Sequence, residues 1–197
     1  MAEEIKRLAP DLVGDFFNIH SATNEAGWCF CSAWWVPTWE GWNERTAEQN
    51  RLIRDTLFQS GIFDGYLFYE DGQPIGWCQV VLRDHLTKLR KQFNLQSDSK
   101  TWAITCFLVI PRLRRHGKAA RFLEFILDDL RDRGVERVEA FPRKGSNLDE
   151  MDLWNGPMSM FQEAGFTTTG ESATRDVMIL NLKMDQRTAG QDSKGEG

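Results

Sequence analysis

The stretch "CFLVIPRLRRHGKAARFLEFIL", residues 106–127, decides the fold. It opens with apolar and β-branched residues, and Trp102–Val109 is predicted to be a buried strand. From Lys118 onward, apolar residues recur at spacings of three and four, which predicts an amphipathic helix ending near Gly134. A helix N-terminus favours acids, yet the start of this helix gathers four bases: Arg112, Arg114, Arg115 and Lys118. We therefore expect an anion to bind at this end of the helix.

The rest of the sequence predicts strands and helices that alternate around this unit. The segment "GYLFYEDGQPIGWCQVVL", residues 65–82, predicts a hairpin that turns at Asp71-Gly72. A hairpin needs antiparallel strands, whereas the strand–helix–strand unit from Trp102 to Phe141 needs a parallel, right-handed crossover. The predicted fold class is therefore α/β (α+β) with a mixed sheet. Further helices are predicted at Pro10–His20, Glu44–Gln59 and Trp154–Ala164, and further strands at Ile5–Leu8, Val135–Phe141, Phe166–Thr169 and Val177–Leu182. Arg83–Gln96 is predicted to be partly helical, and Asn24–Thr38 to be either a strand or an ordered loop.

Bulk properties indicate a soluble globular chain. The 197 residues suit one domain over residues 1–183, and the polar segment 184–197 is predicted to be a disordered tail. A net charge of -5 argues against general nucleic-acid binding. The longest apolar run, Ala103–Ile110, is too short to span a membrane, and the N-terminus lacks a signal-peptide pattern. A cytoplasmic protein is expected.

The helix entrance carries the pattern Arg114-x-x-Gly117-x-Ala119. It is neither the GxxxxGK[ST] loop of nucleotide hydrolases nor the GxGxxG dinucleotide fingerprint. Residues 106–127 closely resemble motif A of the GNAT N-acetyltransferases, whose pattern is Arg/Gln-x-x-Gly-x-Gly/Ala. The resemblance extends over most of the chain and includes "MFQEAGF", residues 160–166. With "WCFCSAWW" at residues 28–35, the chain resembles a bacterial subgroup of that family with an N-terminal Cys-x-Cys segment.

The resemblance implies the GNAT fold, a mixed central sheet of about six or seven strands flanked by helices. It also implies an N-acetyltransferase that moves an acetyl group from acetyl-coenzyme A to a primary amine of a small molecule. The amine would attack directly in a ternary complex. The family's loop and helix start bind the coenzyme pyrophosphate, and the preceding strand pairs with the pantetheine arm. The matching residues here are Phe107, Leu108, Val109, Arg114, Arg115, His116, Gly117, Lys118, Ala119 and Ala120.

Two departures from the family concern catalysis. Phe161 stands where many members have a general-acid Tyr, and Ala103 stands where some have a Glu base. Glu139, on the neighbouring predicted strand, is the first candidate base, and Cys106 is a second candidate for chemistry. A structural hydrogen bond or a solvent-facing side chain for the first, and plain core packing for the second, remain alternatives.

The aromatic segment from Trp28 to Trp42 is predicted to form the acceptor pocket, with Trp28, Cys29, Cys31 and Trp35 as substrate-binding candidates. Aromatic faces hold apolar groups and also attract cations, so a small amine with an apolar or aromatic part is expected. The simplest reading of Cys29 and Cys31 is two buried thiols on one face of an extended segment. Their spacing matches no strong zinc pattern, and no metal is predicted. His20 and His85 have no partner visible in the sequence.

Three functions stay open at this point. The leading one is the acetyltransferase, with transfer of another acyl group as its enzyme alternative. The second is a coenzyme-A-binding regulatory protein of the same fold without turnover, which Phe161 and Ala103 motivate. The third is a redox or metal-responsive module built on Cys29 and Cys31. The sequence also leaves open whether the chain forms a homodimer.

Overall fold

The fold is built around a central mixed sheet. A computed structural model describes residues 2–23, 27–149 and 152–183. Within these residues the sheet has seven strands in the order β1-β2-β3-β4-β5-β7-β6. The strands are β1 (Glu3–Arg7), β2 (Gly65–Glu70), β3 (Gln73–Leu82), β4 (Thr101–Val109), β5 (Arg137–Ala140), β6 (Thr167–Glu171) and β7 (Asp176–Asn181). The helices are α1 (Val13–Ala22), α2 (Ala47–Gln59), α3 (Thr87–Gln92), α4 (Lys118–Asp132) and α5 (Met158–Glu163). Short 3-10 turns are η1 (Pro10–Leu12), η3 (Arg83–His85), η4 (Pro111–Leu113) and η5 (Asp152–Asn155).

The β4–α4–β5 crossover and the β2–β3 hairpin confirm the predicted mixed sheet. β4 and β5 pair in parallel, and the other neighbouring strands pair antiparallel. At the hairpin turn, Asp71 has φ +48° and Gly72 has φ +78°. Two consecutive left-handed residues match the twist of an antiparallel ribbon, which is why Asp-Gly suits this position. None of the described helices is long and apolar enough to cross a membrane.

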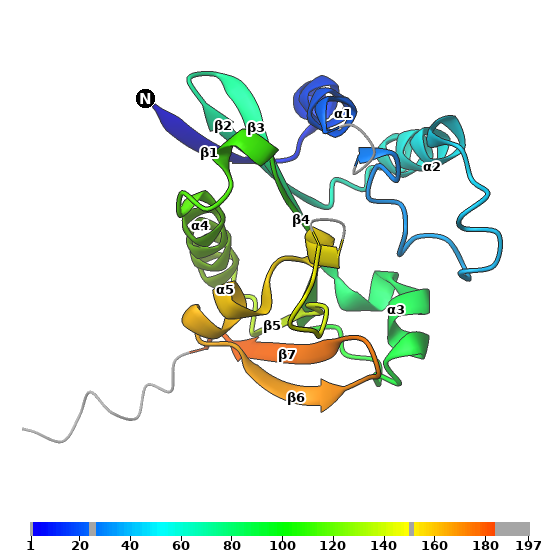
Figure 1. Ribbon diagram of the computed structural model, residues 1–197, viewed down its shortest axis with the longest axis vertical. Coiled ribbons are helices and arrows are strands. Elements are labelled where there is room, and N and C mark those ends of the chain that lie inside the picture. The colour runs from blue at the N-terminus through cyan, green and yellow to red at the C-terminus, as the bar shows by residue number, and fades with distance from the viewer. Residues whose placement is uncertain (1, 24–26, 150–151, 184–197) are drawn as a thin grey trace, which may run out of the picture.

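Helices cover both faces of the sheet (Figure 1). The apolar stripe of α4, which includes Phe122, Ile126 and Leu130, packs on one face together with α5. On the other face α1 contributes Phe16 and Ile19 to a second cluster. Along β2 successive residues alternate between the two clusters, with Tyr66 and Phe68 in the first and Leu67 and Tyr69 in the second, as period-two side-chain geometry requires.

A bulge in β4 breaks this alternation at one place. Gln79 of β3 pairs with Cys106 and Val80 pairs with Ile104, so Thr105 is the extra residue. Thr105 is fully buried, and its hydroxyl donates to Gln79 Oε1 at 2.8 Å. Its carbonyl accepts a hydrogen bond from Asn155 Nδ2 at 2.8 Å. The bulge is thus held from two directions.

Three sequence-based assignments need correction or lie outside the described residues. The late helix does not begin at Trp154, because Gly156 (φ +88°) and Pro157 separate η5 from α5. Proline lacks an N–H and disfavours helical geometry in the residue before it. The described part of the early segment is a run of turns, with Phe30 at φ +42° and Cys31 at φ +49°, so it is an ordered loop and not an extended strand. The predicted tail, residues 184–197, lies outside the described residues.

A buried ion pair fixes this loop, which we call the thiol loop (residues 27–36). Arg54 of α2 is fully buried and donates to Asp64 Oδ1 at 2.5 Å. The same guanidinium donates to the carbonyl oxygens of Phe30 at 3.0 Å and Cys31 at 2.6 Å. Burying a charge is costly unless it is paired and its donors are satisfied, and here both conditions are met.

Replacing Asp64 with Ala should therefore destabilise the fold by about 3–5 kcal/mol, because it leaves the Arg54 charge buried and uncompensated. Urea unfolding followed by circular dichroism measures the change. The control is Asp55→Ala, which removes an exposed partner whose Oδ2 lies 3.9 Å from Arg51 Nε. That change should cost less than about 0.5 kcal/mol, and equal losses for both variants would contradict the assignment.

Candidate functional site

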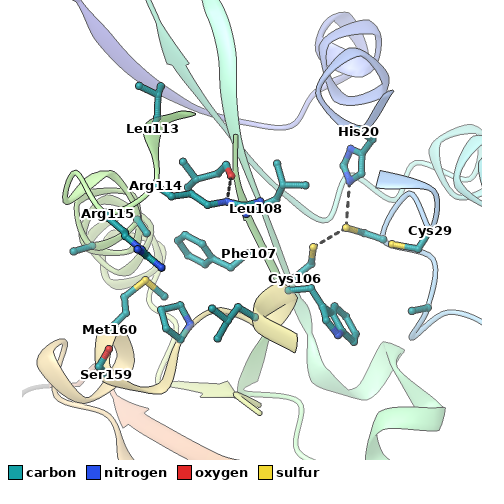
Figure 2. Close-up of a pocket in the computed structure, with 18 of the residues that line it drawn as sticks. His20, Cys29, Cys106, Phe107, Leu108, Leu113, Arg114, Arg115, Ser159 and Met160 are labelled. Carbon is teal, nitrogen blue, oxygen red and sulfur yellow. Dashed lines mark hydrogen bonds between the residues drawn. The ribbon is translucent and has the colours of Figure 1, made fainter. Parts of the chain in front are cut away.

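A cavity of about 600 Å³ follows the edge of β4 where β4 and β5 part. The paired residues end at Ile104 and Ala140, although β4 continues to Val109. Beyond that point the strand edge that faced β5 borders the cavity, and its backbone N–H and C=O groups require other partners. Figure 2 shows Arg115, Ser159 and Met160 on one side of the cavity, His20 and Cys29 on the other, and Cys106 to Leu108 between them.

One end of the cavity is the start of α4. Gly117 is the N-cap in a left-handed conformation (φ +73°), and no side chain among the described residues caps the helix. The first N–H groups of a helix lack partners within it and carry a partial positive charge. Arg115, also left-handed at φ +62°, and Arg114 line this end. The arrangement is suited to an anion.

Most of the predicted coenzyme residues line this cavity. They are Phe107, Leu108, Val109, Arg114, Arg115, Gly117, Ala119 and Ala120. His116 is exposed and Lys118 is half-buried, and neither is part of the lining.

Some of the basic side chains at this end already form ion pairs or hydrogen bonds with other groups of the protein. The Lys118 ammonium forms ion pairs with Glu3 and with Glu70, the latter at 2.5 Å. Arg114 Nε donates to the Val109 carbonyl at 2.9 Å. The expectation that all four bases face an anion was therefore wrong for Lys118.

The comparison that decides the family is a match of residues 28–155 to the sequence profile described as "Acetyltransferase (GNAT) family". The chain is a member of the GNAT acetyltransferase family. It is thus an acyltransferase by family, and the matched residues include β4, the α4 entrance and the thiol loop. Among curated proteins, none matches the sequence.

Solved structures agree with this fold at low sequence identity. The ribosomal-protein-S18-alanine N-acetyltransferase from Escherichia coli is 14% identical, with a TM-score of 0.56 over 95% of this chain and 98% of that one. The PaiA N-acetyltransferase from Thermoplasma acidophilum, solved in complex with coenzyme A, is 11% identical, with a TM-score of 0.56 over 92% and 99%. An N-acetyltransferase from Staphylococcus aureus Mu50 is 13% identical, with a TM-score of 0.55 over 93% and 100%. Such distant likenesses show the fold alone.

Tryptophans surround the other end of the acetyltransferase's cavity. Trp28, Trp39, Trp42 and Trp154 line it, and the Trp28 and Trp42 ring centroids lie 5.1 Å apart. Trp35, a predicted substrate-binding residue, is not in the lining. Its Nε1 instead donates to Asp64 Oδ2 at 3.1 Å, so it belongs to the support of the thiol loop.

A lysine of the protein already occupies part of the aromatic surface. Lys88 Nζ lies 3.3 Å from the centroid of the Trp39 ring and donates to the Ala33 carbonyl. Burial lowers the pKa of Lys88 to about 8. The idea that these rings attract a cationic substrate therefore fails at Trp39, where the cation is internal.

Glu139 does not reach the cavity. Its Oε1 accepts from Arg83 Nη1 at 2.6 Å, and both side chains are about 5% exposed. Burial raises the pKa of Glu139 above its ordinary value, against the opposing effect of Arg83. The carboxylate serves a buried ion pair, so the structure does not support it as a base for an acceptor in this cavity.

The thiols do reach the cavity. Cys29, Cys31 and Cys106 all line it, together with His20. Cys31 Sγ lies 2.8 Å from Cys106 Sγ and 3.3 Å from His20 Nε2. Cys78, by contrast, belongs to the core on the α4 face of the sheet. Among the described residues, no group of three or more His, Cys, Asp or Glu side chains is arranged to hold a metal ion.

Sequence reasoning missed His20 and the late-segment residues of the lining. These late-segment residues come from η5, from α5 and from the N-cap of α5, and they are Leu153, Trp154, Pro157, Ser159, Met160 and Glu163. Phe161, matched in sequence to the family's Tyr, is fully buried in the core and does not line the cavity. The Gly156-Pro157 pair could have indicated this arrangement from the sequence. It prevents one continuous helix from Trp154 onward and so changes the direction of the chain between η5 and α5.

The charge of a residue at the α4 entrance should control coenzyme affinity. Gly117→Asp and Gly117→Asn are nearly isosteric, both residues tolerate left-handed backbone, and a Cβ at this position meets nothing within 4 Å. The Asp variant should bind coenzyme A at least about tenfold more weakly than the Asn variant, because its carboxylate repels the pyrophosphate. Isothermal titration calorimetry measures both affinities. Equal affinities would remove the pyrophosphate from this end of the cavity.

Proposed function

We propose that this acetyltransferase moves an acetyl group from acetyl-coenzyme A to a primary amine of a small molecule. The observation that carries the proposal is the single cavity that joins the α4 entrance to the tryptophan-lined end along β4. One end suits a pyrophosphate and the other suits an apolar acceptor, so the two substrates can meet beside the strand.

The chain's own groups fit the coenzyme at each step along this path. The uncapped α4 entrance and Arg115 would hold the pyrophosphate. The edge of β4 beyond Ile104, which β5 does not pair, would offer its backbone groups to the pantetheine amides, except for the Val109 carbonyl that Arg114 holds. When bound, acetyl-coenzyme A supplies an activated thioester. The residues therefore need only to position the amine and stabilise the developing charges.

We assign direct attack by the amine, without an acyl-cysteine intermediate. Burial and the hydrogen bond to Cys106 raise the pKa of Cys31, and the hydrogen bond to Cys31 and burial raise that of Cys29. Burial also lowers the pKa of His20 to about 3, so this imidazole is a weak base. The sequence had suggested that no histidine accompanies a thiol. His20 corrects that premise, but a protonated thiol beside a weak base is a poor nucleophile.

Cys106 has a different role in this proposal. It lies on β4 between the two ends of the cavity and accepts the hydrogen bond from Cys31, so its own S–H remains available to donate. We assign it as the proton donor to the leaving sulfur, a task that the buried Phe161 cannot perform. The Cys31 hydrogen bond lowers the pKa of Cys106, while burial and Cys29 raise it. The balance keeps it above the ordinary value, so the thiol is protonated at neutral pH.

The kinetic pattern tests direct transfer. With an amine from a panel that includes arylalkylamines and an alanine-ended peptide, initial-rate plots at several amine concentrations should intersect. Intact-mass spectra after incubation with acetyl-coenzyme A alone should show no acetylated protein. Parallel lines with an acetylated cysteine would establish a covalent route. Tight coenzyme binding without thiol release across the whole panel would favour the regulatory alternative.

Two tryptophans separate acceptor binding from loop support. Trp28→Ala should raise the KM for the amine by roughly tenfold while leaving that for acetyl-coenzyme A unchanged, because Trp28 lines the acceptor end. Trp35→Ala is the matched control. It loses a hydrogen bond to Asp64 and should lower stability without shifting the amine KM. The same KM change in both variants would leave the acceptor end unassigned.

A further inference from the structure

Two cysteine sulfurs meet in the cavity wall although their positions are 75 residues apart in the chain. Cys31 comes from the thiol loop and Cys106 from β4, and their Sγ atoms lie 2.8 Å apart. Both residues are less than 5% exposed overall, yet both line the cavity, so a small molecule inside it can reach them. Figure 2 shows Cys106 and His20 approaching this point from opposite sides.

The protein holds Cys31 in this place against a conformational cost. Its backbone is left-handed (φ +49°), as is that of Phe30 (φ +42°), and such geometry is strained for residues other than glycine. Arg54 Nη2 and Gln79 Nε2 donate to the Cys31 carbonyl at 2.6 and 3.1 Å. The strain is therefore offset by buried polar contacts whose effect is to aim one sulfur at another.

Polar groups also surround the Cys31 sulfur. Trp77 Nε1 donates to it at 3.1 Å. His20 Nδ1 lies 2.8 Å from the Phe16 carbonyl, which only accepts, so in the neutral imidazole Nδ1 carries the proton. His20 Nε2, 3.3 Å from Cys31 Sγ, is then a bare nitrogen, which makes it a polar neighbour of the sulfur but, with a pKa of about 3, not a base for its proton.

We propose that Cys31 and Cys106 form a reversible oxidation site that reacts with a small peroxide and closes to a disulfide in the cavity wall. Cys31 sulfur attacks one peroxide oxygen and the O–O bond breaks. The departing hydroxide, a strong base, takes the Cys31 proton and leaves as the first water, and Cys31 becomes a sulfenic acid. Cys106 sulfur then attacks the Cys31 sulfur, the S–O bond breaks, and the hydroxyl leaves as a second water with the Cys106 proton. Two thiols are oxidised by two electrons and one peroxide is reduced to two waters.

The geometry favours this pair over the other thiols. A disulfide bond is about 2.05 Å long, so the two sulfurs need to approach by only about 0.8 Å. Cys78 packs in the core on the opposite face of the sheet. Cys29 is half-buried in the same loop and lines the same cavity, which makes it the matched control.

Oxidation has a predicted effect on transfer that rests on the proposed function. If the Cys106 S–H is the proton donor, the disulfide removes it and acetyl transfer should fall at least tenfold. Dithiothreitol should restore the activity. The oxidised chain should also unfold at a temperature higher by about 5–10 °C, because the bond constrains the unfolded state.

The test uses the full chain, reduced and then treated with stoichiometric hydrogen peroxide. The expected product has lost the mass of two hydrogen atoms. Chymotryptic cleavage after Phe30 separates Cys29 from Cys31, so peptide mapping should find Cys31 joined to Cys106. Cys29→Ser should form the same crosslink. Cys106→Ser should not, and it should leave a sulfenic acid on Cys31 that dimedone traps.

The results separate the oxidation site from the proposed function. A crosslink through Cys29, a sulfinic acid at Cys31 or Cys106 without a crosslink, or an unreacted wild-type protein would overturn the oxidation site. If Cys106→Ser did not fold, mapping of the wild-type chain would still decide. A 31–106 crosslink that leaves transfer unchanged would support the site and overturn only the role of Cys106 as proton donor. Peptide mapping needs no amine substrate, so it tests the oxidation site even if the protein turns over no acceptor.

Discussion

The short parallel pairing of β4 with β5 is the constraint on which the rest of the structure depends. It joins the two strands only from Thr101–Arg137 to Ile104–Ala140. A parallel pair needs a crossover, so α4 must begin beside the end of β4, and its free N–H groups face the region that opens as the strands part. A helix start suited to an anion and a free strand edge thus come from one topological requirement. A longer parallel ladder would close the cavity and bury the helix start.

The tryptophan-lined end depends on a different kind of support, because Trp28, Trp39 and Trp42 lie in no helix or strand. The thiol loop has turn hydrogen bonds of its own but no helix or strand ladder, and buried donors from α2 and β3 take the carbonyls of Phe30 and Cys31. Arg54 and Gln79 also donate hydrogen bonds to Asp64, so one carboxylate holds both of the side chains that support the loop. This explains why a segment with two left-handed residues is ordered. It also explains why its tryptophans divide between those that line the cavity and those, such as Trp35, that anchor the loop.

Much of this arrangement could be predicted from the sequence, and the failures share a cause. The buried strand, the amphipathic helix and the Asp71-Gly72 turn are local patterns, and all three are confirmed. The coenzyme side of the cavity follows from them, because it is built from consecutive residues. The partners of Lys118, Glu139 and Trp35 could not be predicted, since each is chosen by residues that the fold brings from far along the chain. The meeting of His20 with Cys31 is of the same kind, because only the loop geometry sets it.

The bulge at Thr105 has a consequence for strand phase. In a regular strand Cys106 would share a face with Ile104, and therefore with α4, because side chains alternate. The extra residue resets the count, so Thr105 contacts Gln79 and Cys106 lies in the cluster on the α1 side of the sheet. Phe107 is thereby returned to the α4 core. One inserted residue thus decides which of the two side chains, the Cys106 thiol or the Phe107 ring, lies on the same side of the sheet as Cys31, and its removal would exchange the two.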